Sequence, residues 1–334
     1  MHTRPIRPGE IDQFLDTAGR PDHREETKQY LHSMFAAGSM RPEWCFVVQE
    51  RDDPPLGRVA FWTLPGMETP FALVLLEVPW EGDHAGLGAR LLGDVLDEAR
   101  RLGADRIEHV LDTPPMRPQF QHYLEKRLEV LEGAGFAFKR ETDRFHWLRE
   151  EAPPVPGRLS FRTLDEVGED AFVDAMMRVS EGTLDREIRE ERAKLGPLPA
   201  ARDFFEDARR VEHDPLWWRL AYDGPGGDLA GLVMPAEPPG FLTLFYVDVV
   251  PEMRGRGYVD DLLAAGTATL LGARAEDATG KPLLADTDVA NAPMAAAFGR
   301  AGWTRFAGRR EYVVDLAPAL GDDARPGGYS PVPG

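Results

Sequence analysis

The residues best suited to chemistry lie between positions 247 and 263, where an apolar run passes through a basic glycine-rich loop into a helical pattern. Pro251 ends the expected strand because proline cannot donate to a β-ladder. Residues 254–257 (RGRG) then offer two cations and two glycines just before the helix. Glycines let a ligand approach the backbone, and the N–H groups of a helix N-terminus attract anions. The segment therefore predicts a phosphate or pyrophosphate site.

The spacing of this loop identifies the type of phosphate site. It lacks the Gly-Lys-Ser/Thr ending of a Walker loop and the Gly-x-Gly-x-x-Gly of a dinucleotide-binding fold. Its pattern, Val-x-Pro-x-x-Arg-Gly-x-Gly, resembles motif A of the GNAT superfamily of acyl-CoA-dependent N-acyltransferases. Residues 287–303 resemble motif B of that superfamily, with Asn291, Phe298, Gly302 and Trp303 at its characteristic positions. The alternative is a surface turn followed by an unrelated amphipathic helix.

The resemblance implies acetyl-CoA, or another acyl-CoA, as co-substrate. It assigns backbone groups of the motif A strand to the pantetheine, with an oxyanion-stabilising N–H near Val249, and backbone groups of residues 254–259 to the pyrophosphate. Val259 stands where the superfamily often has a smaller residue. The predicted cofactor-binding residues are Val247, Val249, Arg254, Gly255, Arg256, Gly257, Tyr258, Val259, Asn291 and Phe298.

The general acid expected from the resemblance is missing. Phe298 occupies the position where the superfamily often has a tyrosine that protonates the leaving thiolate. A thiol with a pKa near 8.5 is a tolerable leaving group without such help. Otherwise Tyr258 or Tyr246 would have to serve.

The candidate general base is Asp286, five residues before Asn291, where several relatives carry an acidic residue. Strand alternation places Asp286 and Asp288 on one side of the same strand. A carboxylate beside the thioester can take the proton of the attacking ammonium group, with its pKa raised by burial. We therefore predict Asp286 as the catalytic residue. The alternative for both aspartates is a capping role before the next helix.

Residues 150–158 form a Pro-rich linker that divides the chain into similar halves. We expect a degenerate GNAT-like domain at 1–149, a GNAT domain with the CoA site at 159–316, and a flexible tail at 317–334. The halves match at a constant offset, with Gly86 in the place of Gly257. Asp83 stands in the place of Arg254, and its carboxylate would repel a pyrophosphate. The first half is therefore expected to keep the fold and lose the cofactor, unless backbone N–H groups alone suffice.

The order of elements predicts an α/β (α+β) fold, and the resemblance implies two tandem GNAT domains. Each half shows strands in meander order followed by a β-α-β unit, which indicates a mixed, mainly antiparallel sheet flanked by helices. In the second half we expect strands at 216–222, 229–235, 241–250, 282–286 and 310–316.

Composition excludes several kinds of partner. A net charge of −18 opposes binding to nucleic acid or to an anionic membrane, and agrees with an amine substrate. The single cysteine, Cys45, fits a reducing cytosol, and no spacing typical of a metal site occurs. There is neither a signal-peptide pattern nor an apolar run of about 18 residues. We expect a cytoplasmic protein that uses no metal and binds neither nucleic acid nor membranes.

The resemblance extends over nearly the whole chain as a fold, to two-domain bacterial members that include mycothiol synthase. It implies an N-acetyltransferase that moves an acetyl or small acyl group from acyl-CoA to a primary amine of a small molecule by direct attack. A mycothiol-synthase-like activity is one alternative. A non-catalytic acyl-CoA-binding or regulatory protein is another, and amine-dependent release of CoA would exclude it.

Overall fold

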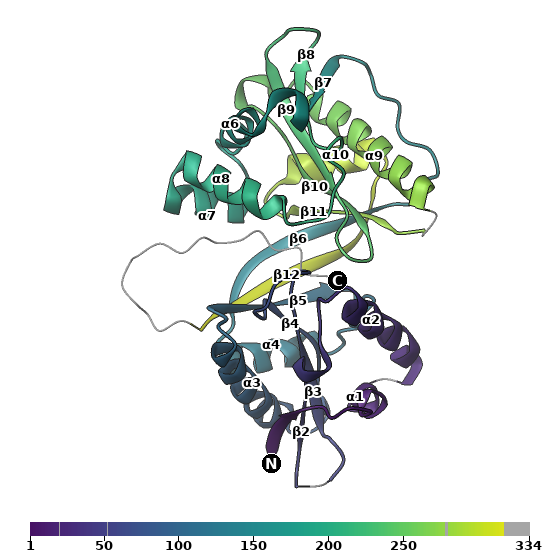
Figure 1. Ribbon diagram of the computed structural model, residues 1–334, viewed down its shortest axis with the longest axis vertical. Helices are drawn as coiled ribbons and strands as arrows, with labels where there is room; N and C mark the ends of the chain where they lie inside the picture. The colour runs from purple at the N-terminus through teal and green to yellow at the C-terminus, as the bar shows by residue number, and fades with distance from the viewer. Residues whose placement is uncertain (20, 52, 278–279, 317–334) are drawn as a thin grey trace. The chain divides into compact units, whose positions relative to one another are not determined.

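The computed structural model describes residues 1–316 except 20, 52 and 278–279 (Figure 1). The tail predicted at 317–334 lies outside the described residues. The chain forms two compact units. The first contains residues 1–140 and 309–316 of the described chain, and the second contains residues 141–308.

The unit boundaries differ from the split expected at the Pro-rich linker. The long strands β6 (Ala137–Trp147) and β12 (Thr304–Asp315) each contribute residues to both units. In the second unit, residues 142–147 of β6 pair with all of β11 (Leu283–Asp288) in antiparallel register. Ladder pairing with distant strands, rather than position along the chain, therefore decides which unit these residues join.

The first unit has the strand order β1-β2-β3-β4-β5-β12, and its pairs are antiparallel from β1 to β4 and parallel between β4 and β5. Its elements are β1 (His2–Pro5), α1 (Ile11–Asp16), α2 (Arg24–Ala36), β2 (Cys45–Gln49), β3 (Gly57–Trp62), β4 (Ala72–Glu77), α3 (His84–Arg101), β5 (Arg106–Thr113) and α4 (Leu124–Gly133), with short 3-10 turns at Pro21–His23 and Pro42–Trp44.

Two apolar clusters cover the two faces of this sheet, because neighbouring strand residues point in opposite directions. Val47 packs in the cluster that holds Phe14 of α1 and Leu31 of α2. Val48 packs in the other, with the apolar stripe of α3 and with residues of α4. Helices therefore flank the sheet on both sides.

The second unit has the strand order β6-β11-β10-β9-β8-β7. Its pairs are antiparallel except for that between β10 and β11. Its further elements are β7 (Leu159–Thr163), α5 (Leu164–Val167), α6 (Glu169–Val179), α7 (Arg186–Leu195), α8 (Pro197–Ala208), β8 (Arg219–Asp223), β9 (Leu229–Ala236), β10 (Leu242–Val249), α9 (Tyr258–Asp277) and α10 (Ala292–Ala301), with a 3-10 turn at Pro251–Met253.

The core of the second unit is one apolar cluster. Helices α6 and α8 contribute Phe172 and Phe205, which pack around Trp218. Helix α9 packs on β9 and β10 through Leu262 and Leu263. Figure 1 shows these helix groups on either side of the central strands. The predicted mixed, mainly antiparallel sheet flanked by helices is confirmed.

The sequence analysis did not predict one of the strands. Residues 137–147 (AFKRETDRFHW) form the eleven-residue strand β6, whose many charged residues do not form the apolar run expected of a buried strand. Its charges are instead paired with neighbouring strands, as in the 2.9 Å ion pair of Arg140 with Glu311. In the part of the chain that the structure describes, no helix is long and apolar enough to cross a membrane.

Candidate acyl-CoA site

A cavity of about 300 Å³ lies at the carboxyl-terminal end of β10, next to the start of α9. The residues lining it come from the α6–α7 loop, from β10 and the loop that follows it, and from the start of α10. They are Gly182, Thr183, Leu184, Asp248, Val249, Met253, Arg254, Gly255, Gly257, Tyr258, Val259, Asn291, Pro293 and Met294. Seven of the ten predicted cofactor residues thus meet at one cavity, and Val247, Arg256 and Phe298 do not line it.

The two parallel strands of the unit separate as they approach this cavity. Strand β10 pairs with β11 only through Leu242 and Thr243. A register irregularity between Leu244 and Tyr246 follows, whereas β11 stays paired with β6 to its end. The later half of β10 therefore has no partner on the β11 side, which leaves backbone groups available to an extended amide-bearing ligand.

The glycine-rich loop presents backbone donors to the cavity. Gly255 and Gly257 have φ values of +77° and +76°, a conformation that glycine adopts without strain. Within the described chain, none of the backbone N–H groups of residues 255–259 donates to a protein acceptor. These N–H groups, at the N-terminus of the 20-residue helix α9, are therefore free to donate to an anion, as the prediction of a phosphate site requires.

Arg158, at the end of the predicted linker, binds the carbonyl groups of the glycine-rich loop. Its guanidinium donates to the carbonyl oxygens of Arg256 and Gly257, both at 2.9 Å. It also forms a 2.9 Å ion pair with the fully buried Asp261 of α9 and lies over the Tyr258 ring. Because the carbonyls are held by Arg158, the loop keeps its N–H groups for a ligand. Sequence reasoning missed this residue, which lies outside both motifs.

The two loop arginines serve the loop's own structure. Arg254 donates to three backbone carbonyls, those of Val249 (3.1 Å), Val179 (2.7 Å) and Glu181 (2.9 Å). Arg256 donates to the carbonyl of Glu252 and lies outside the cavity lining. Arg254 thus ties the loop to the end of α6, and the backbone N–H groups remain the predicted contacts to the pyrophosphate.

Asp248 is the titratable group in the cavity with the most unusual environment. Its side chain is 20% exposed, and Arg254 Nη2 lies 3.9 Å from its carboxylate. Burial raises the pKa of Asp248 to about 7, although Arg254 and a 2.7 Å hydrogen bond from the Val249 N–H both oppose this rise. A carboxylate that titrates near neutral pH beside the strand gap suits a general base. The Val249 N–H expected to stabilise an oxyanion is bound to Asp248 here.

Asp286, the base predicted from sequence, does not reach the cavity. Its side chain is 31% exposed and faces Arg144 on β6 at 3.4 Å. Asp288 is buried and accepts from the N–H groups of Arg186, at the start of α7, and Ala290. The capping alternative therefore describes Asp288, and the assignment of the base to Asp286 lacks geometric support. A sequence signal for Asp248 was available, because it is the one charged residue in an otherwise apolar strand.

The motif B residues separate into a cavity residue and a core residue. Asn291 lines the cavity and caps α10, with Oδ1 accepting from the Met294 N–H at 3.2 Å. Phe298 is 2% exposed and stacks on Phe145 at a ring distance of 4.9 Å, with Trp303 at its edge. Phe298 thus packs in the core and does not line the cavity, and the cofactor contact expected for it stays a prediction.

Phe298→Tyr should destabilise the protein by about 1–3 kcal/mol, since it buries a hydroxyl among the rings of Phe145 and Trp303. Acetyl-CoA affinity and turnover per folded molecule should stay the same. Thermal unfolding and steady-state rates would measure both effects. A clear gain in turnover would contradict this placement and restore the acid role expected at position 298.

Neither alternative tyrosine stands out as an acid. Tyr246 is buried beneath α8, where Phe204 packs against its ring. Tyr258 lines the cavity, but a hydrogen bond with Asp223 raises the pKa of its hydroxyl. Among the described residues no group of His, Cys, Asp and Glu is placed to hold a metal ion.

The corresponding loop of the first unit is closed by its own side chain. Asp83 caps α3, and its Oδ1 accepts from the Gly86 N–H at 2.9 Å. A carboxylate therefore occupies the helix N-terminus where a phosphate would have to bind. This contact supports the interpretation that the first unit has lost the cofactor.

Comparison of structures identifies the fold. A GCN5-related N-acetyltransferase from Sphaerobacter thermophilus matches with a TM-score of 0.58 at 16% identity, over 96% of both chains. A GCN5-related glucosamine N-acetyltransferase region of a fungal multi-domain β-N-acetylglucosaminidase matches with a TM-score of 0.53 at 13% identity, over 94% of this chain and 38% of that one. No protein-family model and no curated protein sequence matches. The predicted GNAT fold is confirmed, and it extends over both units.

Proposed function

We propose that the protein is an acyl-CoA-dependent N-acyltransferase that transfers an acetyl or small acyl group to a primary amine of a small molecule. The observation that carries the proposal is the position of Asp248, a carboxylate with a pKa of about 7, in the cavity formed by the separated strands and the glycine loop. The anion site of residues 255–259 supports acyl-CoA as donor, because its N–H groups lack protein acceptors.

Different groups of the cavity bind the parts of acyl-CoA and accept the proton of the amine. The N–H groups of residues 255–259 hold the pyrophosphate, and the half of β10 that is not paired with β11 holds the pantetheine amides. When bound, acyl-CoA supplies a thioester carbonyl as electrophile. Asp248 accepts the proton of the attacking amine as the C–N bond forms and the C–S bond breaks. The thiolate leaves without a protein acid, as the low pKa of thiols permits.

The charge of the protein favours an amine acceptor. The net charge of −18 attracts cationic substrates over a distance, and Asp248 attracts an ammonium group at close range. A panel of amines, assayed for CoA release with a thiol-detecting dye, tests the proposal. Release that depends on one class of amine supports it. Saturable acetyl-CoA binding without release by any amine would favour the non-catalytic alternative.

Titration calorimetry with acetyl-CoA should give a stoichiometry near one per chain, because Asp83 closes the corresponding loop of the first unit. Asp83→Ala should leave both stoichiometry and affinity unchanged, because Gln119 and Gln121 still fill the space between β4 and β5 where the pantetheine would have to lie. A stoichiometry near two in the unmodified protein would show that the first unit also binds the donor.

A further inference from the structure

A second cavity, of about 160 Å³, lies in the first unit beside the end of β4. Its walls come from the α1–α2 segment, from β3, from the residues that follow β4, and from the segment that precedes α4. It shares no lining residue with the acyl-CoA cavity of the second unit. By the internal duplication, it corresponds to the strand gap that holds the thioester in the proposed enzyme site.

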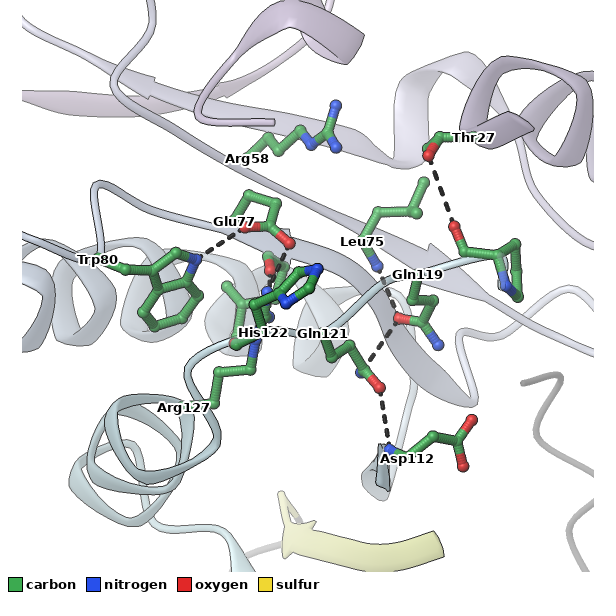
Figure 2. Close-up of polar contacts among 12 residues, drawn as sticks. Thr27, Arg58, Leu75, Glu77, Trp80, Asp112, Gln119, Gln121, His122 and Arg127 are labelled. Carbon is green, nitrogen blue, oxygen red and sulfur yellow. Dashed lines mark hydrogen bonds and ion pairs between the residues drawn. The ribbon is translucent and has the colours of Figure 1, made fainter. Parts of the chain in front are cut away.

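The strand gap beneath this cavity is filled by the protein itself. Strands β4 and β5 pair through one residue pair only, and two glutamine side chains enter the space between them. Gln119 Oε1 accepts from the Leu75 N–H at 3.0 Å. Gln121 accepts from the Asp112 N–H at 3.2 Å (Figure 2). It also donates to the Val110 carbonyl at 2.6 Å. A pantetheine arm therefore has no path, and the cavity suits a small ligand.

The cavity walls hold two buried guanidinium groups and one partly buried carboxylate. Arg58 is 5% exposed and Arg127 is 1% exposed. Arg127 is fully engaged, since it donates to the carbonyls of His122 and Leu76 and forms a 2.5 Å ion pair with Glu77. Glu77 also accepts from Trp80 Nε1 at 2.7 Å. Figure 2 shows Glu77 between Trp80 and Arg127. The carboxylate is thus committed to Arg127.

Arg58 has no ion pair of its own, because the nearby Glu77 carboxylate, which raises the pKa of Arg58 through space, is paired with Arg127. Its Nη1 donates to the carbonyls of Phe14 and Leu15, and its Nε is buried without any hydrogen-bond acceptor. No carboxylate of the described chain lies within ion-pair distance of this guanidinium. Burial lowers the pKa of Arg58 to about 10, so the group stays charged at neutral pH. A buried charge without a counter-ion is costly unless a ligand supplies one.

Flat rings form part of the remaining walls, together with aliphatic and polar residues and the exposed Glu81. His23 stacks on Phe120 with ring centres 3.7 Å apart and the planes within 3°. Trp80 and Tyr123 stack at 6.4 Å, and Arg127 lies over the Trp80 ring at 4.4 Å. Aromatic walls favour planar ligands. In volume, the cavity accommodates about five water molecules, which limits a ligand to about one ring.

We propose that this cavity of the first unit binds a small planar carboxylic acid, with the carboxylate paired to Arg58 and the planar body against the aromatic side chains. The degenerate unit then serves as a separate binding module for an organic anion. The inference does not depend on the acyltransferase activity proposed for the second unit.

The test uses the full chain with benzoate as the probe and benzamide as its neutral isostere. Calorimetry and thermal-shift measurements should show saturable benzoate binding. Benzamide should bind at least about tenfold more weakly, since only benzoate carries a negative charge that can pair with the Arg58 guanidinium. Arg58→Met keeps the apolar stem and removes the charge, so it should abolish this preference. Arg90→Met, an exposed residue on α3 outside the cavity, is the matched control and should bind as wild type.

If Arg58→Met fails to fold, Tyr123→Ala replaces it, because Tyr123 is 44% exposed and its loss removes only one wall. It should weaken benzoate binding and leave acetyl-CoA affinity unchanged. Equal affinity for benzoate and benzamide, or no binding of either at millimolar concentration, would overturn the proposal. Undiminished benzoate binding in both variants would do so as well. If the protein shows no acyltransferase activity but still prefers benzoate to benzamide, the proposal for the first unit is supported.

Discussion

Asp248→Asn should lower the rate of acyl transfer about 100- to 10,000-fold, which is the usual cost of losing a positioned base. Asparagine keeps the size and the hydrogen-bonding oxygen of the side chain but cannot accept the proton. In the proposed site the pyrophosphate contacts come from residues 255–259, so the affinity for acetyl-CoA should stay within a few-fold of the original. Steady-state turnover with the best amine, together with calorimetry, would separate the two effects.

The pH dependence provides a second test of the same assignment. A base works only when deprotonated, so turnover of the unmodified protein should fall as the pH drops through about 7, the pKa to which burial raises Asp248. The Asp248→Asn variant should lose this step. Turnover that is unchanged by the substitution, or a step that survives it, would show that another group takes the proton.

Folding stability should report the same pKa without any substrate. The folded-state pKa of Asp248 lies above its ordinary value of 3.8, so the native state binds a proton more tightly than the unfolded state. Between about pH 4 and pH 7 the contribution of Asp248 to the stability of the native state therefore falls as the pH rises. The melting temperature of Asp248→Asn, relative to wild type, should increase over this interval and level off above it.

Asp286→Asn is the matched control for these measurements. It makes the same chemical change in the same unit, but Asp286 faces Arg144 and does not line the cavity. Turnover and its pH profile should stay close to those of the unmodified protein. A loss as large as that of Asp248→Asn would return the catalytic role to Asp286.

Arg254→Glu should weaken acetyl-CoA binding by about 100-fold or more. It removes three charge-assisted hydrogen bonds that hold the glycine loop to Val249, Val179 and Glu181, each worth about 1.5–3 kcal/mol. It also places a carboxylate beside the pyrophosphate site. Loss of only about 2.7 kcal/mol of binding free energy would produce the hundredfold effect. Calorimetry with acetyl-CoA is the direct measurement.

Arg90→Glu changes the net charge by the same amount on α3 of the first unit and should leave the affinity intact. Circular dichroism would confirm that Arg254→Glu is folded. If the folded variant still bound acetyl-CoA as wild type, neither the three carbonyl contacts nor the charge of Arg254 would matter to the loop.

The sequence alone determined the anion loop and its loss in the first unit. Both depend on residues that are neighbours in the chain. A proline, two glycines and a helical repeat over residues 251–263 specify a turn and a helix N-terminus wherever the segment lies. Asp83 needs only to stand three residues before Gly86 to cap its helix. The order of strands and helices followed from the same local periodicities, and it was sufficient to predict the fold.

Only the tertiary structure decided which side chains work at the cavity. Asp248 and Asp286 lie on neighbouring strands, and their environments differ because β11 is paired with β6 whereas β10 has separated from β11. Arg158 reaches the loop carbonyls from 98 residues away in sequence. Burial, pKa and ion pairing depend on what long-range pairing brings together, and β6 shows that a strand rich in charged residues can supply such a partner. Local sequence patterns do not predict these contacts. The energy of each contact depends on atoms that are distant in sequence and come together only in the folded protein.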